Sequence, residues 1–87
     1  MLTLKDCMDM TELEVGEIEA IAEHEHIPQI VAAELGHLLL STALGRRRIR
    51  VMIADDMEHA RQCGNERHAV ELRQVLSKYR HAHPDCR

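Results

Sequence analysis

The sequence predicts an all-α fold, a compact bundle of four main helices preceded by one short N-terminal helix. Tyr79 is the only aromatic residue, so the core has to be built from Leu, Ile, Val, Met and Ala, and strand-like runs of β-branched or aromatic residues are scarce. Apolar residues recur instead at helical spacing, between polar residues that suit helix caps. A chain of 87 residues provides one modest core, so residues 1–87 are expected to form a single helical domain.

Capping patterns predict where the first helices begin. Thr3 with Asp6 indicates a short helix within roughly the first nine residues. Thr11 followed by Glu14 fits a capping box, in which the two side chains satisfy the free N–H groups of a helix start. The helix that this box opens is expected to end at about residue 25.

The next helix begins at Pro28, where the missing N–H costs nothing, but its end is open to two interpretations. Gly45 is one candidate for the C-terminal stop. Alternatively, the turn falls at Ser41–Thr42, and Thr42 caps the following helix, which then includes Gly45.

The last two helices have clearer boundaries. The first of them is expected to end near Gly64, and Asn65 suits the N-cap of the second. Pro84 ends any helical structure. Cys63 is expected to be a small core residue, because free cysteine usually packs as a small hydrophobe.

Charge is distributed unevenly along the chain, whose formal net charge is −4. Residues 1–45 carry one basic and nine acidic side chains, whereas residues 46–87 carry ten basic and six acidic ones. This asymmetry and the small core favour a homodimer or an oriented protein partner. Nucleic acid is not an expected partner, because the chain is acidic overall and lacks aromatic side chains that stack on bases.

The sequence also bears on location. No run of apolar residues approaches the roughly 18 that a membrane-spanning helix needs, and the acidic residues near the N-terminus are unlike a secretory signal. The cysteines form no CxxC pair and are expected to be reduced thiols. They are Cys7, Cys63 and Cys86. Together these features predict a cytoplasmic protein that does not associate with a membrane.

Three carboxylates fall on the apolar faces of three predicted helices, when residues are placed at the helical advance of about 100° each. They are Glu25, Glu34 and Asp56, and all three are expected to point inward. A buried ionised carboxylate has to pair, take up a proton or bind a metal ion. His37 and His59 follow two of the carboxylates at i+3, which is the same helix face. The five residues are the predicted metal site.

The spacing Glu34-x-x-His37 and Asp56-x-x-His59 resembles the Glu-x-x-His motif of ferritin-like di-iron bundles. The resemblance implies a carboxylate–imidazole site, and such ligands suit iron, manganese or zinc. Asp replaces Glu in one of the two motifs, and the predicted helices are short, so a complete site of this type would need two chains.

The position of the turn decides whether the two motifs can meet. If it is centred on Gly45, Glu34 and Asp56 lie at one level of an antiparallel hairpin. If it lies at Ser41–Thr42, they are offset by about seven residues, or roughly 10 Å, and cannot share an ion within one hairpin.

A second resemblance involves longer segments. The sequence EHEHIPQIVAAELG at residues 23–36, followed by DDMEHA at residues 55–60, is similar to segments of small helical proteins of bacteria. It extends over most of the chain and implies a bacterial cytoplasmic helical domain. It brings no activity with it.

Two charged runs have alternative interpretations. Residues 23–26, Glu-His-Glu-His, form either a solvated helix end or a patch that responds to pH or metal. The arginines of residues 46–48, with Arg50, point in different directions around a helix. They bind phosphate or an acidic protein, form a solvated turn, or form salt bridges to the acidic N-terminal half of a second copy.

These patterns predict a small metal-binding or metal-responsive helical protein, with a di-iron-type carboxylate–histidine site as one form. The alternative is a non-catalytic accessory or regulatory module that binds another protein. The sequence contains no nucleophile elbow, phosphate-binding loop or CxxCH haem-attachment motif, so it indicates no particular reaction.

Overall fold

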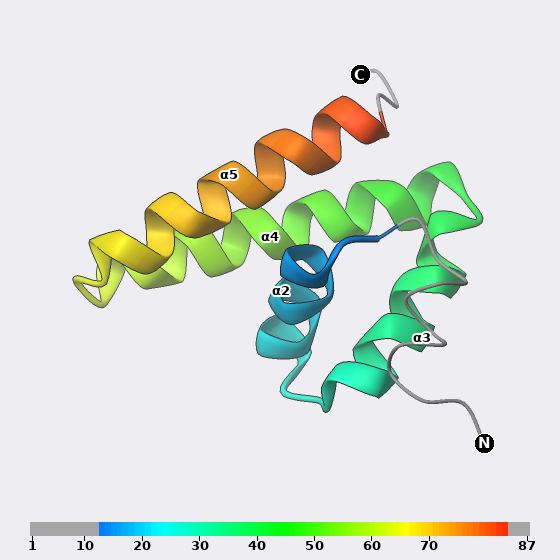
Figure 1. Cartoon of the computed structure of the whole chain (residues 1–87), viewed down its shortest axis with the longest axis horizontal. Coiled ribbons are helices and arrows are strands. Elements are labelled where there is room, and N and C mark those ends of the chain that lie inside the picture. Colours follow the sequence, from blue (N-terminus) through cyan, green and yellow to red (C-terminus); the bar gives the residue numbers. More distant parts are fainter. Residues whose placement is uncertain (1–12, 84–87) are drawn as a thin grey trace.

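Residues 13–83 are described by the computed structural model, and they form four α-helices with no strand among them. The helices are α2 (Val15–Glu25), α3 (Gln29–Leu40), α4 (Ala43–Gln62) and α5 (Glu66–Ala82). Helices α4 and α5 lie side by side and antiparallel, and α2 and α3 pack against one side of α4 (Figure 1). The prediction of an all-α bundle of four main helices is confirmed. The short N-terminal helix predicted from Thr3 lies outside the described residues.

Two helix starts follow the predicted capping chemistry. The Thr42 side chain accepts a hydrogen bond from the Gly45 N–H at 2.9 Å, so the turn lies at Ser41–Thr42, which was one of the two alternatives. The Asn65 side chain accepts a hydrogen bond from the His68 N–H at 3.2 Å. Each contact satisfies one backbone donor that the first turn of a helix leaves free.

Helix α2 begins later than the predicted capping box. The backbone N–H of Glu14 donates to the Glu17 side chain at 3.0 Å, so the reciprocal contact lies one turn beyond the expected pair. Thr11, the predicted cap, lies outside the described residues. The C-terminal end at Glu25 agrees with the prediction, and His26 closes it in the left-handed conformation with φ of 59°.

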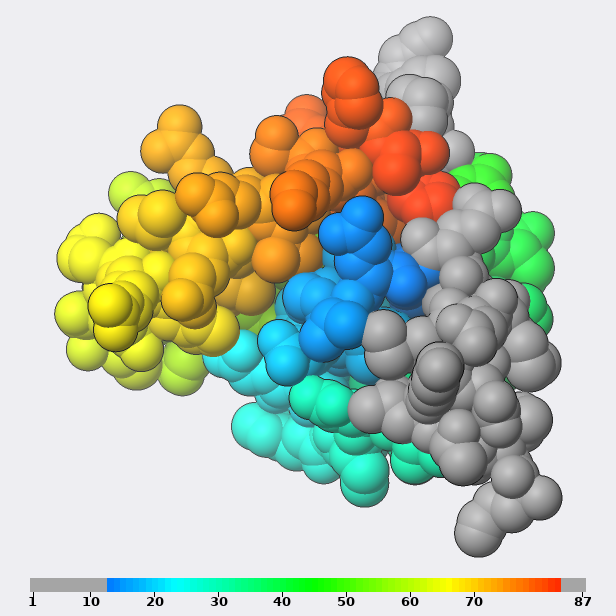
Figure 2. All heavy atoms as spheres, in the orientation of Figure 1, coloured from blue at the N-terminus to red at the C-terminus, as the bar shows by residue number. Residues whose placement is uncertain are grey.

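The core joins residues of all four helices. Its largest fully buried side chains are Ile18, Ile21, Ile49, Ile53 and Tyr79. The Tyr79 hydroxyl donates to the backbone carbonyl of Arg46 at 3.0 Å, which satisfies a polar group that burial would otherwise make costly. This hydrogen bond ties the last turns of α5 to the first turn of α4. In the space-filling view, α2 lies directly against α5 (Figure 2).

The buried face of α3 is not the one predicted. Ala32, Ala33 and Gly36 face the core, whereas Leu38 is 67% exposed. A Cβ atom at Gly36 would collide with the side chain of Leu13, so the smallest residues allow the backbone to approach closely. The prediction had placed Glu34 on the buried face, and this residue is exposed instead, whereas Ile30, Leu35 and Leu39 are partly buried against the core. Cys63 is also exposed at the end of α4, so its predicted core position is wrong.

No helix in the described part of the chain is long and apolar enough to cross a membrane.

The corner between α3 and α4 depends on a second close approach. A Cβ atom at Gly45 would overlap the backbone carbonyl oxygen of Leu39. Backbone cannot move aside as a flexible side chain can, so the glycine is required here although it is unfavourable inside helices.

We expect Gly45→Ala to lower the free energy of unfolding by about 1–3 kcal/mol, the usual cost of overpacking, although alanine is the better helix former. Urea denaturation followed by circular dichroism measures the change. Leu44→Ala is the matched control, because Leu44 is the preceding residue and is exposed, so the change should stay within about 0.5 kcal/mol. Equal effects of the two substitutions would contradict the tight corner.

Candidate functional site

A pocket forms where the C-terminal end of α2 lies against the C-terminal half of α4. We call it the carboxylate–imidazole pocket. Its lining residues are Glu23, His24, His26, Asp55, Asp56, Glu58, His59 and Gln62. No lysine or arginine is among these described lining residues, so histidine supplies the only side chains there that can carry positive charge.

Asp56 is the buried member of this pocket. It lies on the face of α4 that also carries Ile49, Met52 and Ile53, because residues three, four and seven apart share one side of a helix. Only 5% of Asp56 is exposed. Its Oδ2 atom is buried and has no hydrogen-bond partner among residues 13–83. The inward orientation predicted for Asp56 is confirmed.

Burial has a direct electrostatic consequence for Asp56. The pKa of this carboxyl is raised from 3.8 to about 6, mainly because burial removes it from water; the nearby carboxylate of Glu23 adds to the rise, and His24 opposes it. Keeping Asp56 ionised in the folded state therefore costs about 3 kcal/mol, at about 1.4 kcal/mol for each pH unit.

His24 lies between two carboxylates and joins α2 to α4. Its Nδ1 atom is 2.9 Å from Glu25 Oε2, and its Nε2 atom is 3.3 Å from Asp55 Oδ2. Ionised carboxylates only accept hydrogen bonds, so both contacts require a ring that is protonated on both nitrogens. Burial by itself lowers the pKa of His24, but the hydrogen bonds to Glu25 and Asp55 outweigh it, and the net pKa is raised.

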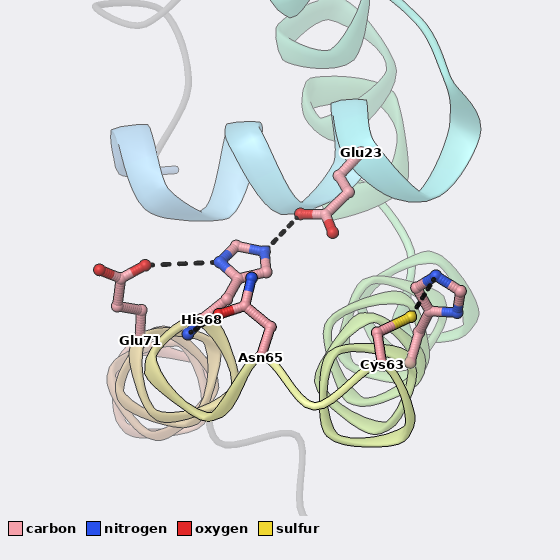
Figure 3. A network of polar contacts seen from close by, with 6 residues as sticks. Glu23, Cys63, Asn65, His68 and Glu71 are labelled. Carbon is pink, nitrogen blue, oxygen red and sulfur yellow. Dashed lines mark hydrogen bonds and ion pairs between the residues drawn. The ribbon is translucent and has the colours of Figure 1, made fainter.

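His68 on α5 makes an equivalent connection next to the pocket. Figure 3 shows its ring between Glu23 of α2 and Glu71 of its own helix. The Nε2 atom is 2.8 Å from Glu23 Oε1, and the Nδ1 atom is 3.4 Å from Glu71 Oε1. The hydrogen bond to Glu23 is the main reason that the pKa of His68 is raised above its ordinary value. The sequence analysis did not single out His68, although the His68–Glu71 spacing of i, i+3 was a visible signal.

The five predicted site residues are distributed unevenly. Asp56 is buried, and His59 lies at the exposed edge of the pocket, with its Nε2 atom 3.6 Å from Cys63 Sγ. Glu25 is exposed and contacts His24. Glu34 and His37 are exposed on α3, and neither lines the pocket.

The inward orientation predicted for Glu34 and Glu25 is therefore wrong. Glu34 lies on the side of α3 opposite the small residues that face the core. Glu25 is the last residue of α2, and the buried residues of this helix end at Ile21. The turn at Thr42 also selects the register in which Glu34 and Asp56 cannot share an ion within one hairpin. Within residues 13–83, no three acidic, histidine or cysteine side chains already stand in an arrangement that would hold a metal ion.

Comparison of the chain with protein-family models, with curated proteins and with solved structures gives no match.

The raised pKa of Asp56 predicts a stabilising substitution. A carboxyl whose pKa is higher in the folded state contributes most stability below its unfolded pKa of 3.8, and this contribution is lost as the pH rises through about 6. We expect Asp56→Asn to raise the free energy of unfolding of metal-free protein by about 1–2 kcal/mol at high pH. This is less than the full cost of the charge, because a buried amide also lacks partners.

Urea denaturation across a pH series measures this effect, and the difference from wild type should shrink as the pH falls below the folded pKa. Asp55→Asn is the matched control, because this adjacent carboxylate is largely exposed and contacts His24. A stabilised Asp55→Asn, or an Asp56→Asn variant less stable than wild type throughout, would contradict the assigned cost of burying Asp56.

The His68–Glu23 contact predicts a shifted titration. In wild type, NMR should give a pKa for His68 above 6.5, and Glu23→Gln should return it toward that value. The associated stability is fully present below the unfolded pKa and is lost as the pH rises through the raised folded pKa. Glu23→Gln should thus cost under about 1 kcal/mol, at acid pH only, because both groups are partly exposed. Glu19→Gln is the control. An unchanged pKa of His68 in the Glu23→Gln variant would contradict the contact.

Proposed function

We propose that this chain is a small metal-binding or metal-responsive helical protein, and that the carboxylate–imidazole pocket holds the ion. The observation that carries the proposal is the buried Asp56 carboxylate, whose Oδ2 atom has no hydrogen-bond partner among the described residues. A buried carboxylate without a partner is costly unless it is protonated or faces a cation. A divalent cation is a partner that offsets this cost.

The donor groups suit particular ions. Carboxylate oxygens are available from Asp56, Glu23 and Asp55, and imidazole nitrogens from His24 and His59. Mixed oxygen and imidazole ligands favour iron, manganese or zinc. Among the carboxylates that line the pocket, Glu58 pairs with Arg61, whereas the lining itself contains no lysine or arginine that could pair with Asp56.

Metal binding by this pocket competes with protons. A metal ligand has to be a deprotonated carboxylate or a neutral imidazole, whereas Asp56 and His24 both have raised pKa values. His24 has to exchange its contacts with Glu25 and Asp55 for the ion. Binding is thus expected to release protons and to strengthen as the pH rises.

The di-iron-type form of the proposal requires a second chain. Glu34 and His37 are exposed on α3, away from the pocket, so these groups can complete a site only across a homodimer interface. We retain the homodimer and a cytoplasmic setting as parts of this proposal. The proposal concerns binding and assigns no reaction.

The test is titration of chelator-treated protein with Zn²⁺, Mn²⁺ and anaerobic Fe²⁺ in a calorimeter, together with the metal content of protein purified without chelator. We expect near-stoichiometric binding of one of these ions, with proton release that depends on the buffer. Asp56→Asn should weaken binding at least about tenfold, because loss of a ligand costs at least as much as loss of a supporting group.

Glu34→Gln is the matched comparison. Unchanged affinity in this variant assigns the ion to the pocket of one chain, whereas a loss equal to that of Asp56→Asn assigns it to a di-iron-type site between two chains. Wild-type protein that binds none of the three ions would overturn the proposal, as would an Asp56→Asn variant that binds as tightly as wild type.

A further inference from the structure

A second surface feature lies between α4 and α5 and shares no lining residue with the carboxylate–imidazole pocket. Two adjoining hollows meet at Leu76 and Arg80 and form one groove along the helix pair. No residue of α2 or α3 lines it. We call it the arginine-rimmed groove. Its arginines are Arg47, Arg50 and Arg61 from α4, and Arg73 and Arg80 from α5.

Apolar side chains from both helices line the groove beside the arginines, and we call them its floor. Val51, Ala54 and Met57 come from α4, and Val70 and Leu76 come from α5. On α4 the three apolar residues follow one another at i, i+3 spacing, and on α5 Val70 and Leu76 lie on either side of Arg73. Val51 is 52% exposed and Val70 is 50% exposed. These half-exposed side chains leave apolar area that a partner can bury.

The rim is strongly basic in a protein whose net charge is −4. Arg61 forms an exposed ion pair with Glu58 at 3.8 Å. The other four rim arginines, at positions 47, 50, 73 and 80, form no ion pair with any residue in the range 13–83. Among residues 13–83, Glu66 is the only acidic residue that lines the groove.

We propose that the arginine-rimmed groove docks an acidic amphipathic helix of another protein. Helix-in-groove recognition places apolar side chains at i, i+3, i+4 and i+7 into a hydrophobic floor. The flanking acidic residues of such a helix would lie against the arginines, which bind carboxylates with two parallel hydrogen bonds. From residue 47 to residue 61 the groove extends about 21 Å at 1.5 Å per residue, which matches roughly four turns of helix.

Two other occupants fit the groove less well. A symmetric dimer through this surface would place the arginines of one copy against those of the other, because an isologous interface brings the same patch together. A nucleic acid would contact the rim through its phosphates, but it would leave the apolar floor unused. The single aromatic residue, Tyr79, is fully buried and cannot stack on bases.

The test uses a fluorescein-labelled synthetic helix of about 16 residues, long enough for the groove, with leucine at i, i+3, i+4 and i+7 and glutamate on both flanks. Fluorescence anisotropy should show saturable binding to the whole protein. A scrambled peptide of the same composition should bind at least about tenfold more weakly, a factor that corresponds to about 1.4 kcal/mol.

Charge reversal locates the site. Arg50→Glu combined with Arg73→Glu should weaken peptide binding at least about tenfold. Arg48→Glu combined with Arg67→Glu is the matched control, because both residues are exposed on the same two helices and neither lines the groove. This control should change the affinity less than about threefold.

Four outcomes would overturn the proposal. They are absence of peptide binding, equal binding of the scrambled peptide, equal losses in the two double variants, and tighter groove-dependent binding of an RNA or DNA duplex. Sedimentation adds a fifth, because self-association that disappears only in the Arg50→Glu, Arg73→Glu variant would assign the groove to a second copy of this chain.

Discussion

The packing of α2 across α4 and α5 is the constraint on which the rest of the structure depends. Ile18 and Ile21 of α2 share one core with Ile49 and Ile53 of α4. Because the chain has a single aromatic residue, no large side chain is available to fill a wide space between helices. The helices therefore pack through aliphatic side chains and small residues, and Gly36 leaves room for the side chains of Leu13 and Ile21. This packing also brings the polar end of α2 against α4, which creates the carboxylate–imidazole pocket.

Asp56 stands out because it breaks the pattern of the face on which it lies. An aliphatic residue at this position of α4 would extend the core, and it would avoid the cost of a buried charge. Exceptions to the rule that buried helix positions carry apolar residues tend to occur at functional sites, where a binding or catalytic role explains the loss of stability. The structure offers no arginine or lysine in the pocket lining as a structural counterion. This combination favours a functional explanation over one in which the carboxylate serves only packing.

The four helices and the Asn65 cap could be predicted from the sequence, and Thr42 was one of two alternatives, because both caps act through contacts with residues three positions away. The inward position of Asp56 was also predictable, since large apolar residues share its face. The buried face of α3 could not be predicted. Its orientation depends on tertiary packing that favours small residues, whereas hydrophobic periodicity gives most weight to large ones. The contact of His68 with Glu23 joins residues 45 positions apart, and no local pattern specifies it.

The charge asymmetry of the sequence corresponds, in the structure, to acidic and basic side chains on different sides of α4. Asp55 and Asp56 face the acidic helix α2, whereas Arg50 and Arg61 belong to the opposite groove. The acidic side is compensated by histidines, whose charge depends on pH, and the basic side carries permanent charge. The exposed Arg61–Glu58 ion pair at 3.8 Å connects the two sides. The other groove arginines form no ion pair within residues 13–83, which suits an acidic partner in the groove.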